Sequence, residues 1–165
     1  MGLQVGERLL ELTFNREMSS NRATDKGKRE ISIVNMLHHI NEKLWKTLFG
    51  RSADGLEVSD SSDSEYWLVD KSPVTNKFTS VGKSGEGGPN PAFYLAGIIE
   101  GFLCAAKLDA KVIAHLDHKA PETSQVNTEN PYSADQSKND KGEVVTIFVI
   151  KFTRETHERD QRINQ

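Results

Sequence analysis

The segment 82–84, Gly-Lys-Ser, has the residue types that bind phosphate, because glycine-rich loops present backbone N–H groups to an anion. The complete P-loop motif also has a glycine five residues before Gly82, where this chain has Lys77. A helix would have to begin at the Lys-Ser pair, but further glycines and Pro89 follow instead. We therefore expect a flexible joint between a strand and a helix here, not a nucleotide site.

Two histidine pairs have side chains that ligate metals, His38 with His39 and His115 with His118. Neighbours on a helix diverge by about 100°, and residues three apart on a strand point to opposite faces. Neither pair is therefore expected to chelate one ion. Cys104 is the single cysteine, which excludes a Cys-based zinc site, and its apolar neighbours predict a buried thiol, not a nucleophile. We expect no metal, no cofactor and no catalytic constellation.

Gly97 and Gly101 are four residues apart in a segment that is predicted to be helical. Glycine costs up to about 1 kcal/mol at each interior position of a helix. Close approach of another backbone explains such a pair, and we expect that backbone to belong to the sheet beneath the helix. Glu100 lies between the two glycines and is expected to point away from this contact, toward a partner.

Hydrophobic periodicity predicts the elements that position these residues. Helices are expected over 3–18, 30–49, 92–108 and, capped by Thr153, through 160; strands are expected over 65–70, 77–81, 111–118 and 144–152. Gly50 stands where the C-cap of the second helix belongs. The strand 144–152 is apolar enough to be central in a sheet. Paired strands set apart from helices indicate an α+β fold, in which helices cover one face of an antiparallel sheet.

Two of the helices carry broad apolar surfaces. The first has two adjacent stripes, one of Leu3, Leu10 and Phe14 and one of Val5, Leu9 and Leu12. The second has one stripe of Ile33, Leu37, Ile40, Leu44 and Leu48, and Met36, Trp45 and Phe49 lie off it. Such a helix is either central in its domain or meets a second protein on its other side.

Polar segments separate these elements. Residues 51–64 are acidic and serine-rich and predict a solvated loop, because the ligand order of a calcium-binding EF-hand is absent. Residues 119–142 have almost no apolar content and predict a mobile insertion in a hairpin. We interpret residues 1–165 as a single domain with this insertion.

Composition restricts the function further. The chain has 165 residues, 21 Lys and Arg against 24 Asp and Glu, and a net charge of −3, which argues against a protein that coats nucleic acid. The start of the chain has the charged residues Glu7 and Arg8, where a signal peptide needs an apolar run. The longest apolar stretch, 94–106, is too short to span a bilayer. A cytoplasmic protein without a transmembrane segment is expected.

Several segments together resemble a known family. They are VGERLLEL (5–12), KREISIVNMLHHINEKLWKTLFG (28–50), EYWLVDKSPVTNKFTSV (65–81), FYLAGIIEGFL (93–103), AKVIAHLDH (110–118) and IFVIKF (147–152). In order and spacing the sequence is similar to the small core subunits of the transport protein particle, the TRAPP vesicle-tethering complex. The resemblance covers most of the chain outside the polar segments.

The resemblance implies an α/β plait with a four-stranded antiparallel sheet, and a non-catalytic scaffold role. The complex acts as a guanine-nucleotide exchange factor for a Rab GTPase in transport from the endoplasmic reticulum to the Golgi. The implied partners are paralogous TRAPP small subunits, a longin-like TRAPP subunit and, through the complex, the GTPase. The implied location is the cytoplasm, peripheral at the endoplasmic reticulum and cis-Golgi membranes. The residues expected at partner interfaces are Leu9, Leu10, Phe14, Met36, Trp45, Phe49 and Glu100.

Two departures from the family accompany this hypothesis. Only residues 1–4 precede the segment that matches the family's early helix, so the chain is expected to be N-terminally short. A paralogous subunit carries an acyl-accepting cysteine where this chain has Glu30, so acylation is not expected. The alternative function is a small-molecule-binding domain with an apolar pocket between the helices and the sheet.

Overall fold

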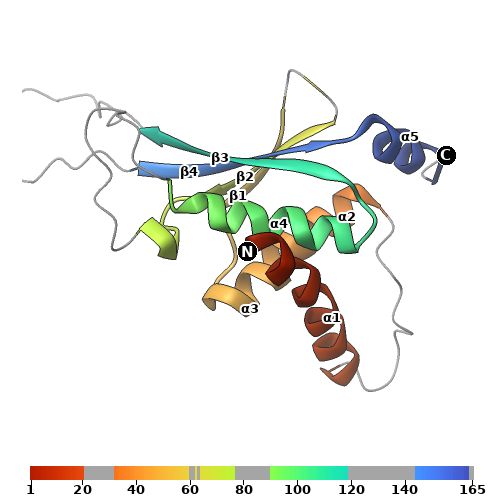
Figure 1. Cartoon of the computed structure of the whole chain (residues 1–165), viewed down its shortest axis with the longest axis horizontal. Coiled ribbons are helices and arrows are strands. Elements are labelled where there is room, and N and C mark those ends of the chain that lie inside the picture. Colours follow the sequence, from red (N-terminus) through yellow and green to blue (C-terminus); the bar gives the residue numbers. More distant parts are fainter. Residues whose placement is uncertain (21–31, 60–61, 63, 77–89, 119–143, 164–165) are drawn as a thin grey trace, which may run out of the picture.

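A computed structural model describes residues 1–20, 32–59, 62, 64–76, 90–118 and 144–163. The predicted strand 77–81, the segment 82–84 and the insertion 119–142 lie outside these residues. Figure 1 shows a sheet whose lower face, in this view, is covered by helices, with α4 directly beneath the strands and α1 packed on the side of α4 away from the sheet. The fold is therefore the expected α+β arrangement of a four-stranded antiparallel sheet with helices on one face.

The sheet has the strand order β1-β2-β4-β3, and every neighbouring pair is antiparallel. The strands are β1 (Gly55–Val58), β2 (Glu65–Asp70), β3 (Ala110–His118) and β4 (Val144–Phe152). The prediction of a central strand at 144–152 is confirmed, because β4 pairs with both β2 and β3. The prediction of a loop over 51–64 is wrong for β1, a short edge strand that adds to β2 despite its polar surroundings.

One continuous helix runs from Ile33 to Phe49 and contains a π-helical turn. It consists of α2 (Ile33–His39), η1 (Ile40–Leu44) and α3 (Trp45–Phe49). Gly50 ends it in the left-handed conformation, at φ 75°, as the C-cap prediction requires. A π turn adds one residue, so each later side chain takes the angular place of the residue before it. Trp45 thereby joins Leu44 in the core, where both side chains are fully buried.

The remaining helices are α1 (Gly2–Ser20), α4 (Ala92–Ala105) and α5 (Arg154–Ile163), with a short 3-10 turn η2 (Val74–Asn76). Thr153 caps α5, because its hydroxyl accepts a hydrogen bond from the Thr156 N–H at 3.4 Å. From the same helix, Asp160 accepts a hydrogen bond from the Ile33 N–H at 2.9 Å. The carboxylate of α5 thus caps the helix that begins at Ile33.

The core lies between the sheet and the helices that cover it. Trp45, Phe102 and Phe148 are its largest fully buried side chains. The rings of Trp45 and Phe148 meet edge to face, with centroids 5.6 Å apart. Aliphatic side chains from α2, η1, β2, α4 and β4 surround them, among them Ile33, Met36, Leu37, Ile40, Leu44, Leu68, Ile99, Leu103 and Ile150.

Candidate functional site

The helices α1 and α4 meet through glycines. A Cβ atom on Gly101 would lie 2.0 Å from the carbonyl oxygen of Leu3, and one on Gly6 would lie 2.1 Å from that of Ile98. A Cβ atom on Gly97 would lie 3.3 Å from the Cα of Gly2. The expectation that Gly97 and Gly101 face the sheet is therefore wrong. Their close neighbour is α1, whose own pair of glycines at positions 2 and 6 repeats the four-residue spacing.

An aromatic stack continues this helix contact. The imidazole of His39 lies between two rings, with its centroid 5.1 Å from that of Phe14 and 5.9 Å from that of Phe102. His39 is buried whereas His38 is exposed, so the two histidines diverge as helical geometry predicts. The stack joins α1, α2 and α4 at one point of the core.

The residues expected at a partner interface divide into two groups. Leu9, Leu10 and Phe14 on α1 and Phe49 on α3 are partly buried against the core. Met36 and Trp45 are 1% exposed, so neither presents surface to a partner. The prediction that Met36 and Trp45 face a partner is therefore wrong. The helix 33–49 is apolar on more than one side because it is packed inside this chain.

Glu100 contacts the edge of the sheet. Its carboxylate accepts a hydrogen bond from the Val112 N–H at 3.1 Å and lies 3.6 Å from the Lys111 ammonium. The side chain is 20% exposed. It points away from the α1 contact as expected, and toward β3; that it also meets a partner stays a prediction. Glu100 satisfies a backbone donor of this edge strand.

The structure identifies other apolar side chains that are exposed on α1 and at the start of α4. We call them the α1/α4 surface; they are Leu3, Val5, Leu12, Phe93 and Tyr94. Sequence analysis placed the three aliphatic ones on stripes of the first helix but missed the two aromatic ones. No sequence signal distinguished this aromatic pair, because other adjacent apolar pairs of the same helix, Ile98 with Ile99 and Phe102 with Leu103, are buried.

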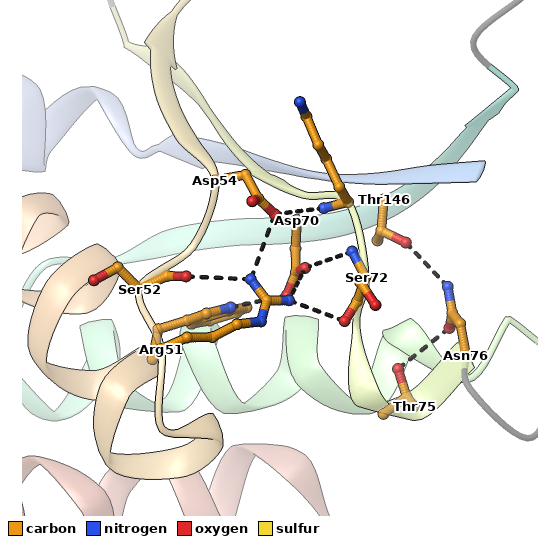
Figure 2. Close-up of polar contacts among 10 residues, drawn as sticks. Arg51, Ser52, Asp54, Asp70, Ser72, Thr75, Asn76 and Thr146 are labelled. Atoms are coloured by element: carbon orange, nitrogen blue, oxygen red, sulfur yellow. Dashed lines mark hydrogen bonds and ion pairs between the residues drawn. The ribbon is translucent and has the colours of Figure 1, made fainter. Parts of the chain in front are cut away.

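A polar cluster fastens the end of α3 to β2 (Figure 2). The buried Asp70 carboxylate accepts a hydrogen bond from the Trp45 indole N–H at 2.9 Å and another from the Arg51 guanidinium. The Ser72 N–H also donates to Asp70, at 2.9 Å. The hydrogen bond with Asp70 is the main reason that the pKa of Arg51 is raised above its usual value, and burial opposes it.

The cluster extends along both neighbouring segments. Asp54 accepts a hydrogen bond from the Lys71 N–H at 2.7 Å and lies 3.4 Å from Arg51. Nearby, the Asn76 amide donates to the buried Thr146 hydroxyl at 3.1 Å (Figure 2). These hydrogen bonds hold the loop after Gly50 against β2 and the segment that follows it.

Cys104 is exposed, and the expectation that it is buried is wrong. Helical spacing puts position 104 on the side of α4 away from the sheet, while Phe102 and Leu103 point inward. Within the described residues, no three His, Cys, Asp or Glu side chains form a group that could hold a metal ion. None of the described helices is long and apolar enough to cross a membrane.

The sequence matches the family described as "Transport protein particle (TRAPP) component" over residues 1–141. The chain belongs to the TRAPP family. It is 44% identical to the trafficking protein particle complex subunit 5 of Dictyostelium discoideum over 115 residues, which are 70% of this chain and 58% of the relative. The subunit 5 of Gallus gallus is 35% identical over the same share of this chain and 57% of its own length. This TRAPP chain therefore matches less than two thirds of these relatives.

A solved structure supports the fold of this TRAPP chain. It is a trafficking protein particle complex subunit 3 from Naegleria fowleri, whose title describes it as covalently bound to palmitic acid. The TM-score is 0.62 over 93% of this chain and 76% of the other, at 14% sequence identity. The similarity shows that both have the same α+β fold.

The face of the sheet opposite the helices carries a hydrogen-bonded ion pair. Glu65 on β2 lies 2.9 Å from the Lys151 ammonium on β4, and it accepts a hydrogen bond from the Trp67 indole N–H at 2.9 Å. The Trp67 hydrogen bond, followed by Lys151, lowers the pKa of Glu65 below its usual value. The folded protein therefore favours the charged carboxylate.

Acid should remove the contribution of Glu65 to stability. Because its pKa is lower in the folded chain, that contribution is present above the unfolded pKa of about 4.3 and disappears as the pH falls through the folded pKa. We expect the difference in unfolding free energy between the wild type and Glu65→Gln to be largest near neutral pH and to shrink below about pH 4. Urea denaturation from pH 3 to 7 measures it. Trp67→Phe should flatten this pH dependence, and a difference that is constant with pH would contradict the assignment.

Proposed function

We propose that this chain is a non-catalytic scaffold subunit of a TRAPP complex. The observation that carries the proposal is the family match over residues 1–141, together with relatives that are named as complex subunits. On this proposal the complex is an exchange factor for a Rab GTPase in transport from the endoplasmic reticulum to the Golgi. This chain holds other subunits in place, in the cytoplasm and peripheral to those membranes.

The α1/α4 surface supports a role in subunit pairing. Leu12 is 52% exposed and Phe93 56%, and both belong to helices that pack tightly on one another. Exposed aromatic and aliphatic side chains on rigid helices are typical of protein interfaces. Paralogous small subunits are the proposed partners on this side, and a longin-like subunit is the proposed partner elsewhere.

Co-expression tests the subunit role. We expect this chain to co-purify with paralogous TRAPP small subunits, and Leu12→Glu to weaken that binding at least tenfold, because the charge would be desolvated in the interface. Val74→Glu is a matched control, since Val74 is similarly exposed but lies on η2. A soluble chain that binds none of these subunits would reject the proposal.

Nucleotide release tests the absence of activity in the isolated chain. An exchange factor stabilises the nucleotide-free GTPase, and on our proposal this requires the assembled complex. We expect the isolated chain to leave the release rate of labelled GDP from a Rab GTPase unchanged. Accelerated release by the chain alone would show that it acts on the GTPase directly.

The ligand-binding alternative has less support. The part of the core that a pocket would occupy contains the fully buried side chains of Trp45, Phe102 and Phe148. The structural relative is titled as covalently bound to palmitic acid, but the single cysteine of this chain, Cys104, is exposed. We therefore favour the scaffold function.

A further inference from the structure

The outer face of the sheet, opposite the helices, is apolar at its centre. Burial alternates along β2, and Trp67 and Val69 point away from the core. On β4 the alternation leaves Ile147 and Val149 on the same outer face, and on β3 it leaves Ile113, which is 37% exposed. In the described part of the chain no helix covers this face (Figure 1). We call these five residues the outer-face patch.

Such a patch is unusual for a solvated sheet. Antiparallel sheets with one wet face alternate apolar residues toward the core with polar residues toward water. The outward positions of β4, a central strand, instead carry Val145, Ile147 and Val149 before the charged Lys151, and of these Val145 is only 7% exposed. The only polar atom of Trp67, its indole N–H, is already bonded to Glu65, so the exposed part of this side chain is apolar. These properties suit contact with another flat apolar layer.

We propose that a second copy of this chain docks on the outer-face patch, sheet against sheet. The register makes the surface self-complementary. Trp67 pairs with Val149 and Val69 with Ile147 directly across β2 and β4. Consider a two-fold axis that runs between β2 and β4, nearly parallel to them. It places each residue of one copy over the residue of the other copy that pairs with it across the strands within a single chain. Large Trp67 then meets the smaller Val149 at two symmetric places.

The charges fit the same arrangement. Glu65 and Lys151 are also direct cross-strand partners. The two-fold axis therefore places the Glu65 carboxylate of one copy over the Lys151 ammonium of the other, and the reverse. The result is a square of four alternating charges at one end of the patch. In the row of Ile147 and Val69, the outermost positions set bulky His115 against Gly55. In the row of Trp67 and Val149 they set Ile113 against Glu57, and this contact at the rim lowers the affinity.

The area of the face sets the expected affinity. Four strands about 4.8 Å apart, with four residues in β1, six in β2 and nine in each of β3 and β4, rise about 3.3 Å per residue and give a face of roughly 450 Å². Two copies then bury about 900 Å², which is slightly less than the roughly 1,000 Å² of a stable specific interface and is typical of a weak, transient one. We therefore expect a reversible dimer with a dissociation constant of about 10–100 µM. This proposal does not depend on the proposed TRAPP role, which uses the helices.

Sedimentation equilibrium of the full chain from 5 to 500 µM tests the dimer. Val149→Glu should weaken self-association at least tenfold, because it places two charges in the centre of the interface. Val34→Glu, on the helix side, is the control and should have no effect. A monomer throughout this range would overturn the proposal. So would a dimer that survives Val149→Glu but is lost in Leu12→Glu, since it would use the α1/α4 surface.

Charge-reversal variants of Glu65 and Lys151 provide a second test if the Val149→Glu variant does not fold. Lys151→Glu alone should weaken the dimer, because it sets like charges against one another in both halves. Glu65→Lys combined with Lys151→Glu should recover much of the affinity that the single variant loses, since the pattern is reversed but still alternates, and the recovery is incomplete because Trp67 loses its acceptor on Glu65. If the double variant is as weak as the single one, the two-fold arrangement is wrong.

Discussion

Replacing Gly101 with alanine should separate α1 from α4 and lower the free energy of unfolding by about 2–3 kcal/mol. The added methyl group would lie 2.0 Å from the Leu3 carbonyl oxygen and 2.8 Å from its carbon. Both atoms belong to backbone, which cannot move aside as the end of a flexible side chain can. The helix must therefore shift as a whole, and the loss exceeds the gain of up to about 1 kcal/mol that alanine brings to a helix interior.

Gly97→Ala is the matched control on the same helix. Its added methyl group would lie 3.3 Å from the Cα of Gly2, a tight contact but not an impossible one. The gain in helix propensity then offsets most of the strain, so we expect a change within about 1 kcal/mol. Urea denaturation followed by circular dichroism measures both variants. Equal effects of the two substitutions would contradict the packing described here.

Asp70→Ala should destabilise the chain by about 3 kcal/mol. The substitution leaves the buried Trp45 indole N–H without its acceptor and removes the partner of Arg51. A buried donor that loses its acceptor costs about 1–3 kcal/mol, and the lost charge pair adds to this. Arg51 is 36% exposed at its side chain and can be rehydrated, so the loss stays below that of a fully buried pair.

Two further variants separate the contributions in this cluster. Trp45→Phe removes only the indole hydrogen bond and should cost about 1–2 kcal/mol, including imperfect packing. Arg51→Gln leaves a buried carboxylate that has lost its cation. A double-mutant cycle between Arg51 and Asp70 gives their coupling, which we expect to be about 1–3 kcal/mol. A coupling near zero would mean that Arg51 stabilises the chain through Asp54 and the backbone carbonyls of Ser52 and Ser72 and not through Asp70.

Sequence patterns predicted those parts of the fold that follow from local chemistry. The apolar run at 144–152 predicted the central strand, and Gly50 predicted a left-handed C-cap. The strand β1 could not be predicted, because its four residues are held by pairing with β2 and not by their own preference. The burial of Trp45 was missed because a π turn changes the helical phase, and no residue type marks such a turn.

The surfaces were predicted less well than the fold. Gly97 and Gly101 correctly indicated a close backbone contact, but periodicity alone could not identify α1 as the neighbour. The spacing of Gly2 and Gly6 was the signal that could have done so. Met36 illustrates a general difficulty, because an apolar side chain off the main stripe fits a wide core contact as well as an interface.

The position of β4 in the sheet has a consequence for synthesis of the chain. The strands β2 and β3 are both made before β4, which pairs with both of them in the described sheet. The helix that starts at Ile33 similarly receives its capping carboxylate from Asp160, 127 residues later. At about 5–20 residues per second, a ribosome needs about 6–25 s to add this stretch. During that interval the nascent chain exposes strand edges and core residues, so its folding in the cell should depend on chaperones that bind such surfaces.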